Sequence, residues 1–321
     1  MRSSICPDTV ASAKAIASSF LFIVALFFSL TPVADANVPL RAPAPASTFD
    51  EGIVQVERFA APGKHALIFI PALACGPWEW NGQIAALAGR YDIYVLRLSG
   101  FDGLRAVPDD ALVSRTAASI ARLVRTRKLS HPIVVGHSIG GSLAIYFAEH
   151  YPELLGGTIA IEGGYPAGSK EQTRRRAAEE DVAPFRANSR EKFERTFETA
   201  MLNDMLQSKA DVDTVARMAA RSDPNAVAAW LYDVDMLDLT PGLSKVHVPI
   251  VEIVPFDASV DAPYGLTLTK KRSLYERWLA RAPRRSVLMI DRARHFVMFD
   301  RPAAFDRALF GAIDRMTGAR P

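Results

Sequence analysis

The segment around Ser138 constrains the fold more than any other part of the chain. Residues 132–135 form a short apolar run, typical of a strand that is buried on both faces. The turn Gly136-His137-Ser138-Ile139-Gly140 follows at once, and residues 142–148 then have the spacing of a helix that Pro152 ends. A serine on such a sharp strand-to-helix turn has a strained backbone and presents its hydroxyl at the carboxyl edge of a sheet. The pattern therefore predicts that Ser138 is a nucleophile.

Further apolar runs lie on both sides of this turn. Residues 66–70 and 93–98 precede it, and residues 158–161, 249–254 and 286–290 follow it. Each run has the length and composition of a buried strand. His295 lies in the loop after the last run and is followed by apolar residues, and a closing helix is expected after Pro302.

The Ser138 turn, the order of the apolar runs and the position of His295 resemble the α/β-hydrolase family over about residues 50–320. The resemblance implies an α/β fold: a mostly parallel central sheet with helices on both faces and an inserted helical cap. It also implies a serine hydrolase that cleaves carboxylic esters through an acyl-enzyme without a cofactor, with Ser138 as nucleophile and His295 as base. Dehalogenase and epoxide hydrolase chemistry is disfavoured, because those relatives have an aspartate at the position of Ser138.

The resemblance also places the oxyanion hole. In this family the loop after the strand at residues 66–70 donates a backbone N–H, and this chain has Pro71-Ala72 where many members have His-Gly. By position, the donors are the N–H groups of Leu73 and Ile139. Trp78 and Trp80, just beyond this loop, are candidates for the walls of the substrate pocket.

Two loops compete to supply the carboxylate that orients His295. The usual loop follows the run at residues 249–254, where Asp257 is the first choice and Asp261 a looser second. In some members the acid instead follows the strand after the nucleophile helix, and in this chain Glu162 occupies that position. His137 is expected to be a packed or hydrogen-bonded neighbour of the site.

The strand pattern stops after Glu162, which divides the expected domain. Residues 51–162 and 241–321 are predicted to form the core, and residues 163–240 the helical cap. A stripe of Phe193, Phe197, Met201 and Met205 recurs at every fourth residue, which indicates a helix with one apolar face. Most of this stripe is expected to pack the cap against the core, and part of it to line an acyl pocket.

Residues 1–36 have the pattern of a signal peptide: a positive start, an apolar run at residues 15–30 and the small-residue site Ala34-Asp35-Ala36. The run is short for a membrane span, which needs about 20 residues. Cleavage after Ala36 is therefore expected, giving an exported periplasmic or secreted protein without stable membrane insertion. Residues 37–50, rich in Pro and Ala, are expected to be a flexible lead-in.

Composition narrows the range of partners. The net charge of +3 over 321 residues, without a basic stripe interleaved with aromatics, argues against nucleic-acid binding and leaves a small-molecule acyl substrate. No histidine pairs with a cysteine or carboxylate at metal-ligand spacing, so no metal site is expected. Cys6 lies in the expected signal peptide, which leaves Cys75 without a disulfide partner. The oligomeric state is not predicted.

Two other functions stay open at this point. One is a peptidase of the same fold, which would need an acidic or amine-binding group in the cap. The other is a non-catalytic relative that serves as a binding module, although the presence of both Ser138 and His295 argues against it.

Overall fold

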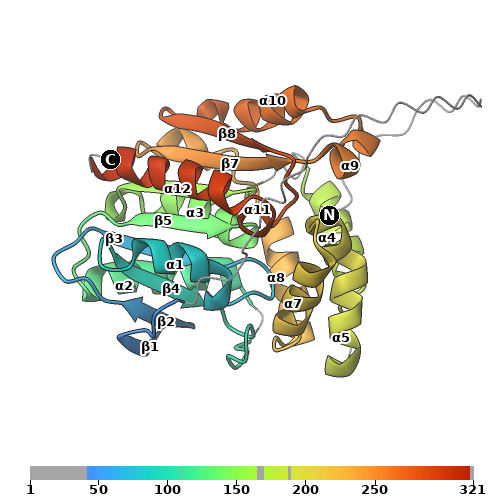
Figure 1. Cartoon of the computed structure of the whole chain (residues 1–321), viewed down its shortest axis with the longest axis horizontal. Helices are drawn as coiled ribbons and strands as arrows, with labels where there is room; N and C mark the ends of the chain where they lie inside the picture. The colour runs from blue at the N-terminus through green and yellow to red at the C-terminus, as the bar shows by residue number, and fades with distance from the viewer. Residues whose placement is uncertain (1–41, 109, 165–169, 187–188, 319–321) are drawn as a thin grey trace, which may run out of the picture.

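A computed structural model describes residues 42–108, 110–164, 170–186 and 189–318. These residues form one eight-stranded sheet in the order β1-β2-β4-β3-β5-β6-β7-β8 (Figure 1). β1 and β2 pair antiparallel, as do β2 and β4, and every other pair is parallel. The strands are β1 (Ser47–Glu51), β2 (Val54–Phe59), β3 (Ala66–Ile70), β4 (Asp92–Arg97), β5 (Ile133–His137), β6 (Gly157–Ile161), β7 (Ile250–Phe256) and β8 (Arg285–Asp291).

The central strands follow from their apolar sequence. Every residue of β3, β5, β6 and β7 is buried. A parallel strand that is covered by helices on both faces needs such an uninterrupted apolar run. The expected mostly parallel sheet is thereby confirmed.

The strand register brings the site loops to one edge of the sheet. Ile70 of β3 pairs with Gly136 of β5, and His137 of β5 pairs with Ile161 of β6. Because these strands are parallel, the residues that follow them lie side by side. Pro71, Ser138 and Glu162 therefore start three neighbouring loops.

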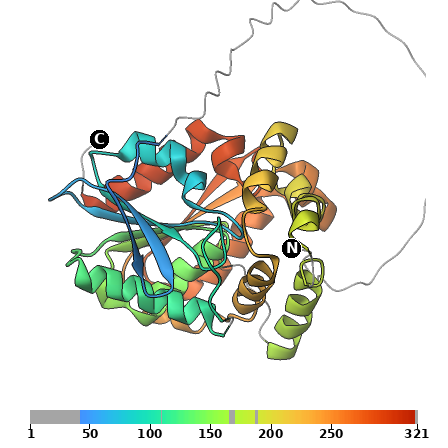
Figure 2. The same cartoon turned by 90° about the horizontal axis from the view of Figure 1, so that it is seen from below.

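Helices cover both faces of the sheet. Figure 2 shows α1 and α12 on one face and α2 and α3 on the other, while α10 packs on β7 and β8. The helices of the core are α1 (Asn81–Leu87), α2 (Leu112–Thr126), α3 (Ile139–His150), α9 (Ala258–Asp261), α10 (Leu268–Trp278), α11 (Val297–Asp300) and α12 (Pro302–Thr317). Short 3₁₀ helices are η1 (Pro77–Trp80), η2 (Pro152–Leu154), η4 (Gly242–Lys245), η5 (Ala262–Tyr264) and η6 (Leu279–Arg281).

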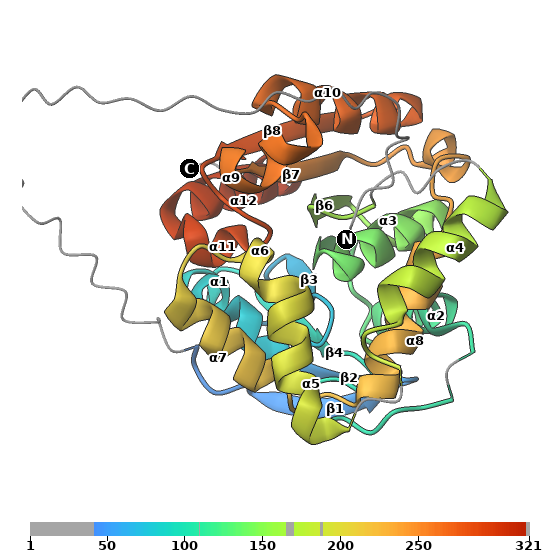
Figure 3. The ribbon, with the colours of Figure 1, turned by 90° about the vertical axis from the view of Figure 1, so that its right-hand side faces the viewer.

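The cap lies between β6 and β7, and the regular elements among its described residues are all helices. Figure 1 shows it at one end of the sheet, and Figure 3, which faces that end, shows α5, α6 and α7 together and α4 beside α8. Its aromatic cluster of Phe185, Phe193 and Phe197 is fully buried. The cap elements are α4 (Glu171–Val182), α5 (Arg190–Phe197), the π-helix η3 (Glu198–Leu202), α6 (Asn203–Met205), α7 (Lys209–Ala219) and α8 (Pro224–Asp235).

The predicted lead-in at residues 37–50 is wrong at its end. Ser47–Glu51 forms the edge strand β1, which pairs with β2 through the two-residue turn Gly52-Ile53. Gly52 has φ +61°, which suits the tight hairpin turn. The core therefore begins before residue 51.

The expected signal peptide, residues 1–36, lies outside the described residues. Within the described ranges, no helix has both the length and the apolar character that crossing a membrane requires.

Candidate active site

Ser138 lies between the last residue of β5 and the first residue of α3. Its φ of 55° and ψ of −119° are strained for a residue with a side chain, a cost of order 1–3 kcal/mol. Its N–H donates to Ile161 O at 2.8 Å, and its carbonyl accepts from Ser142 N at 3.0 Å. The end of β6 and the first turn of α3 therefore both hold Ser138 in place. This is the strained backbone that the sequence predicts for the turn.

Two glycines allow the first turn of α3 to touch both neighbouring loops. A Cβ on Gly140 would lie 2.5 Å from Ile70 O and 2.7 Å from Pro71 O. A Cβ on Gly141 would lie 2.9 Å from the Gly163 Cα. Only residues without a side chain fit there. Ser138 is therefore held directly between the loop after β3 and the loop after β6.

The two expected oxyanion donors, the N–H groups of Leu73 and Ile139, have no backbone acceptor among the described residues. Ile139 is the first residue of α3, so its N–H has no acceptor within the helix. The Leu73 N–H likewise has no acceptor among the described residues. Both residues are nearly fully buried. The contact of Gly140 with Pro71 brings their two loops together, as an oxyanion hole requires.

His295 lies in the loop between β8 and α11, and its partner is Glu162. The distance from His295 Nδ1 to Glu162 Oε2 is 2.7 Å. An ionised carboxylate only accepts hydrogen bonds, so Nδ1 carries the proton and Nε2 is the basic nitrogen. The ring of His295 lies 4.7 Å from that of His137, the residue before Ser138. In the described residues no hydrogen bond joins the Ser138 hydroxyl to His295.

The prediction of Asp257 as the partner of His295 is therefore wrong. Asp257 caps α9: its Oδ1 accepts from Ser259 N at 2.8 Å, and its Oδ2 accepts from Gln207 Nε2 at 2.6 Å. The second choice, Asp261, accepts from Asp257 N at 2.9 Å and pairs with Lys271, and among the described residues no hydrogen bond or ion pair joins it to His295. Strand order does not explain the choice, because β7, which precedes Asp257, lies next to β8, which precedes His295. The contacts explain it: Ser259 and Gln207 bind Asp257, whereas Lys271 and His295 bind Glu162.

Sequence reasoning missed Lys271, which holds the other oxygen of Glu162. Its Nζ lies 2.7 Å from Glu162 Oε1 and 3.1 Å from Asp261 Oδ1. Burial by itself would raise the pKa of Glu162, but the Lys271 ammonium and the His295 hydrogen bond lower that pKa to about 2. Burial lowers the pKa of His295, and the hydrogen bond to Glu162 opposes that effect. The carboxylate is thus charged and the imidazole neutral at pH 7.

Glu252, on the neighbouring strand β7, holds the loop that contains Glu162. It is fully buried on β7, and its Oε1 accepts from Gly163 N at 2.9 Å. Burial raises the pKa of Glu252 well above its ordinary value. The Glu252 carboxyl therefore holds the backbone directly after Glu162, and a strand pattern alone gives no signal for this contact.

The two tryptophans that were expected to line the substrate pocket differ in their burial. Trp80 is fully buried and packs against Phe69 with ring centroids 5.0 Å apart, so it belongs to the core and does not line an open pocket. Trp78 is partly buried against the core, and its pocket role stays a prediction. Cys75 is fully buried and burial raises the pKa of its thiol, which makes it a poor nucleophile.

The cap is hydrogen-bonded to both neighbours of His295. Phe296 N donates to Met205 O at 3.1 Å. Arg294 Nη1 donates to Asn203 O at 3.0 Å and to Leu206 O at 2.8 Å. The cap segment 203–207 therefore rests directly on the His295 loop.

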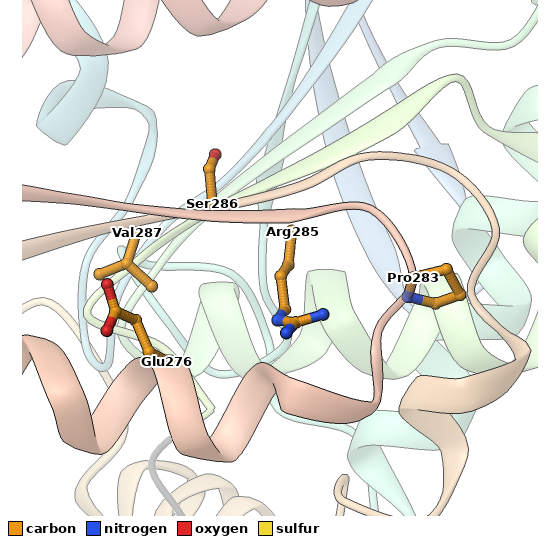
Figure 4. A pocket seen from close by; sticks show the side chains of 5 residues that line it. All are labelled: Glu276, Pro283, Arg285, Ser286 and Val287. Atoms are coloured by element: carbon orange, nitrogen blue, oxygen red, sulfur yellow. The ribbon is translucent and has the colours of Figure 1, made fainter.

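A surface hollow of about 490 Å³ lies between α10 and β8 (Figure 4). It is at the amino end of β8, opposite the edge that carries Ser138, and is not counted as part of the site. The lining residues of the hollow are Glu276, Pro283, Arg285, Ser286 and Val287.

In the described residues, no three His, Cys, Asp or Glu side chains form a group that could hold a metal ion.

Comparisons with known proteins cover most of the chain. The model of a family described as "Alpha/beta hydrolase family" matches residues 67–308. The chain is 27% identical over 181 residues to 2-succinyl-6-hydroxy-2,4-cyclohexadiene-1-carboxylate synthase of Enterobacter sp. (strain 638), which is 53% of this chain and 65% of that protein. The chain therefore spans less than two thirds of this curated relative.

Solved structures share the fold at low sequence identity. A thermophilic esterase from Thermogutta terrifontis superposes with a TM-score of 0.67 at 18% identity, covering 85% of this chain and 100% of that chain. An enol-lactonase from Burkholderia xenovorans superposes with a TM-score of 0.69 at 14% identity, covering 83% and 99%.

Proposed function

Because the chain belongs to the alpha/beta hydrolase family, we propose that it is a serine hydrolase that cleaves carboxylic esters through an acyl-enzyme. One observation carries the proposal: the partly buried pair of His295 and Glu162, at 2.7 Å, beside a serine on a strained turn. That combination supplies a nucleophile, a base and an orienting group.

The first half of the reaction forms the acyl-enzyme. Ser138 Oγ attacks the ester carbonyl while His295 Nε2 takes its proton, and Glu162 stabilises the imidazolium through Nδ1–H. The N–H groups of Leu73 and Ile139 bind the oxyanion of the tetrahedral intermediate. Removing one such donor typically costs about 10²–10³ in rate. When the intermediate collapses, His295 returns the proton to the leaving alcohol.

The second half releases the acid. Water attacks the acyl carbonyl, and His295 Nε2 takes the water proton. The second tetrahedral intermediate collapses, the proton goes to Ser138 Oγ, and the carboxylic acid leaves. The cycle consumes one water and needs no other reactant.

A fluorophosphonate probe tests the nucleophile, since it labels activated serines. Wild type should be labelled at Ser138 and should hydrolyse p-nitrophenyl esters, and a series of acyl lengths then defines the substrate range. Ser138→Ala should lose both activities, whereas Ser130→Ala, at an exposed serine, should keep both. Labelling that persists in Ser138→Ala, or that moves to Cys75, contradicts the proposal. Faster turnover of peptidyl anilides than of esters favours a peptidase instead.

A further inference from the structure

A second histidine–carboxylate pair, which is fully buried, lies beside the first, and the reaction above does not use it. His137 is the last residue of β5 and Glu79 lies in η1, and neither side chain is exposed to solvent. The distance from His137 Nδ1 to Glu79 Oε1 is 2.5 Å. No substrate can reach this pair without displacing the core.

The pair is the middle of a chain of hydrogen bonds. At one end, Ala72 N donates to Glu79 Oε2 at 2.8 Å, directly before the expected oxyanion donor Leu73. At the other end, His137 Nε2 lies 3.0 Å from the carbonyl oxygen of His295. A carbonyl only accepts, so Nε2 carries a hydrogen and donates it. Every polar atom of the two side chains thus has a partner.

From this geometry we propose that Glu79 and His137 are positioning residues, which hold the oxyanion loop and the backbone of His295 at a fixed separation on either side of Ser138. The proposal rests on the proposed function. Three working parts come from loops after β3, β5 and β8, far apart in sequence, and this chain of bonds touches all three. A misplacement of about 1 Å between such parts can cost 10²-fold in rate.

Because the partners fix where the hydrogens lie, the hydrogen bonds of Glu79 can be tested separately from the charge of its carboxylate. In Glu79→Gln the amide oxygen still accepts from Ala72 N–H, and the amide N–H can donate to an unprotonated His137 Nδ1. His137 Nε2–H then still donates to His295. Glu79→Gln should keep kcat near wild type, whereas Glu79→Ala and His137→Phe should lower kcat about 10²-fold with KM changed by less than about threefold.

Asp92 offers a matched structural control. It is a buried carboxylate that accepts from a backbone N–H, Ala61, at 3.1 Å, and from Arg58 and Tyr94, at the amino end of β4. Asp92→Asn should lower Tm with kcat unchanged. Binding of an arylboronic acid, which forms a tetrahedral adduct on the serine, reports the oxyanion donors and should weaken in Glu79→Ala but not in Asp92→Asn.

Three outcomes overturn the proposal. The first is a Glu79→Ala variant that loses Tm as Asp92→Asn does but keeps kcat and boronate affinity. The second is equal damage by Glu79→Gln and Glu79→Ala, because charge rather than bond geometry would then matter. The third does not depend on activity, and so separates this proposal from the proposed function. In the proton NMR spectrum, the far-downfield resonance that disappears in Glu162→Gln reports the hydrogen bond between His295 and Glu162. If the chemical shift of this resonance is unchanged in Glu79→Ala and His137→Phe, Glu79 and His137 do not position His295.

Discussion

Replacing Glu162 by glutamine should disable the enzyme through a change of tautomer. Lys271 Nζ lies 2.7 Å from one oxygen of Glu162, and His295 Nδ1 lies 2.7 Å from the other. The ammonium can only donate, so it will hold the amide oxygen of the new side chain. The amide NH₂ then faces Nδ1, which must become an acceptor. The ring proton moves to Nε2, and His295 can no longer take the proton of Ser138.

The size of the loss follows from this geometry. The comparable aspartate-to-asparagine change in a serine protease triad, which also produces the wrong tautomer, lowers kcat by about 10⁴. That factor corresponds to about 5.5 kcal/mol of transition-state stabilisation. We expect a similar loss for Glu162→Gln, with a smaller change in KM, because Glu162 touches His295 and not the substrate.

The assay is steady-state hydrolysis of a p-nitrophenyl ester, with Asp257→Asn as the matched control. Asp257 binds Gln207 and Ser259, so its amide variant should retain kcat near that of wild type. A Glu162→Gln variant with kcat within tenfold of wild type refutes the reasoning. So does an Asp257→Asn variant that loses as much as Glu162→Gln does.

Three further predictions concern packing, pH and processing. Gly140→Ala should lower kcat by about 10² or more, since its Cβ would push Ile70 and Pro71 away from Ile139, whereas Gly82→Ala, with open space around it, should not. Burial raises the pKa of Glu149 from 4.5 to about 8, so the folded state keeps a proton that the unfolded chain loses, and stability falls as pH rises through this window. The Tm of Glu149→Gln minus the Tm of wild type should therefore increase from pH 5 to pH 8. A difference in Tm that does not depend on pH would contradict this prediction. We propose export with cleavage after Ala36; intact mass from an exporting host should show Asn37 as the first residue, and a retained Met1 would refute it.

The fold could be predicted because its strongest signals are local. The run before Ser138, the glycines after it and the buried strands each follow from a few adjacent residues. β1 was missed because the Pro- and Ala-rich residues before Ser47 suggested irregular chain, and the pairing of β1 with β2 is its main support.

The carboxylate beside His295 could not be chosen from sequence. Two loops at the same sheet edge each present one at a plausible position. The structure distinguishes them through contacts between distant residues: the approach of Gly141 to Gly163, and Lys271, which follows Glu162 by more than a hundred positions. The partnership of Glu79 with His137 is also non-local, since it joins a short 3₁₀ turn to the end of β5.

The hydrogen bonds between the cap and the His295 loop have a consequence for evolution. Arg294 and Phe296 flank His295 directly, and both bind cap segment 203–207. A displacement of that segment reaches the imidazole through a single peptide unit on either side. Substitutions that adapt the cap to a new substrate will therefore change kcat together with the affinity for substrate. Selection for new specificity should leave residues 203–207 in place and concentrate change in cap helices that do not contact this loop.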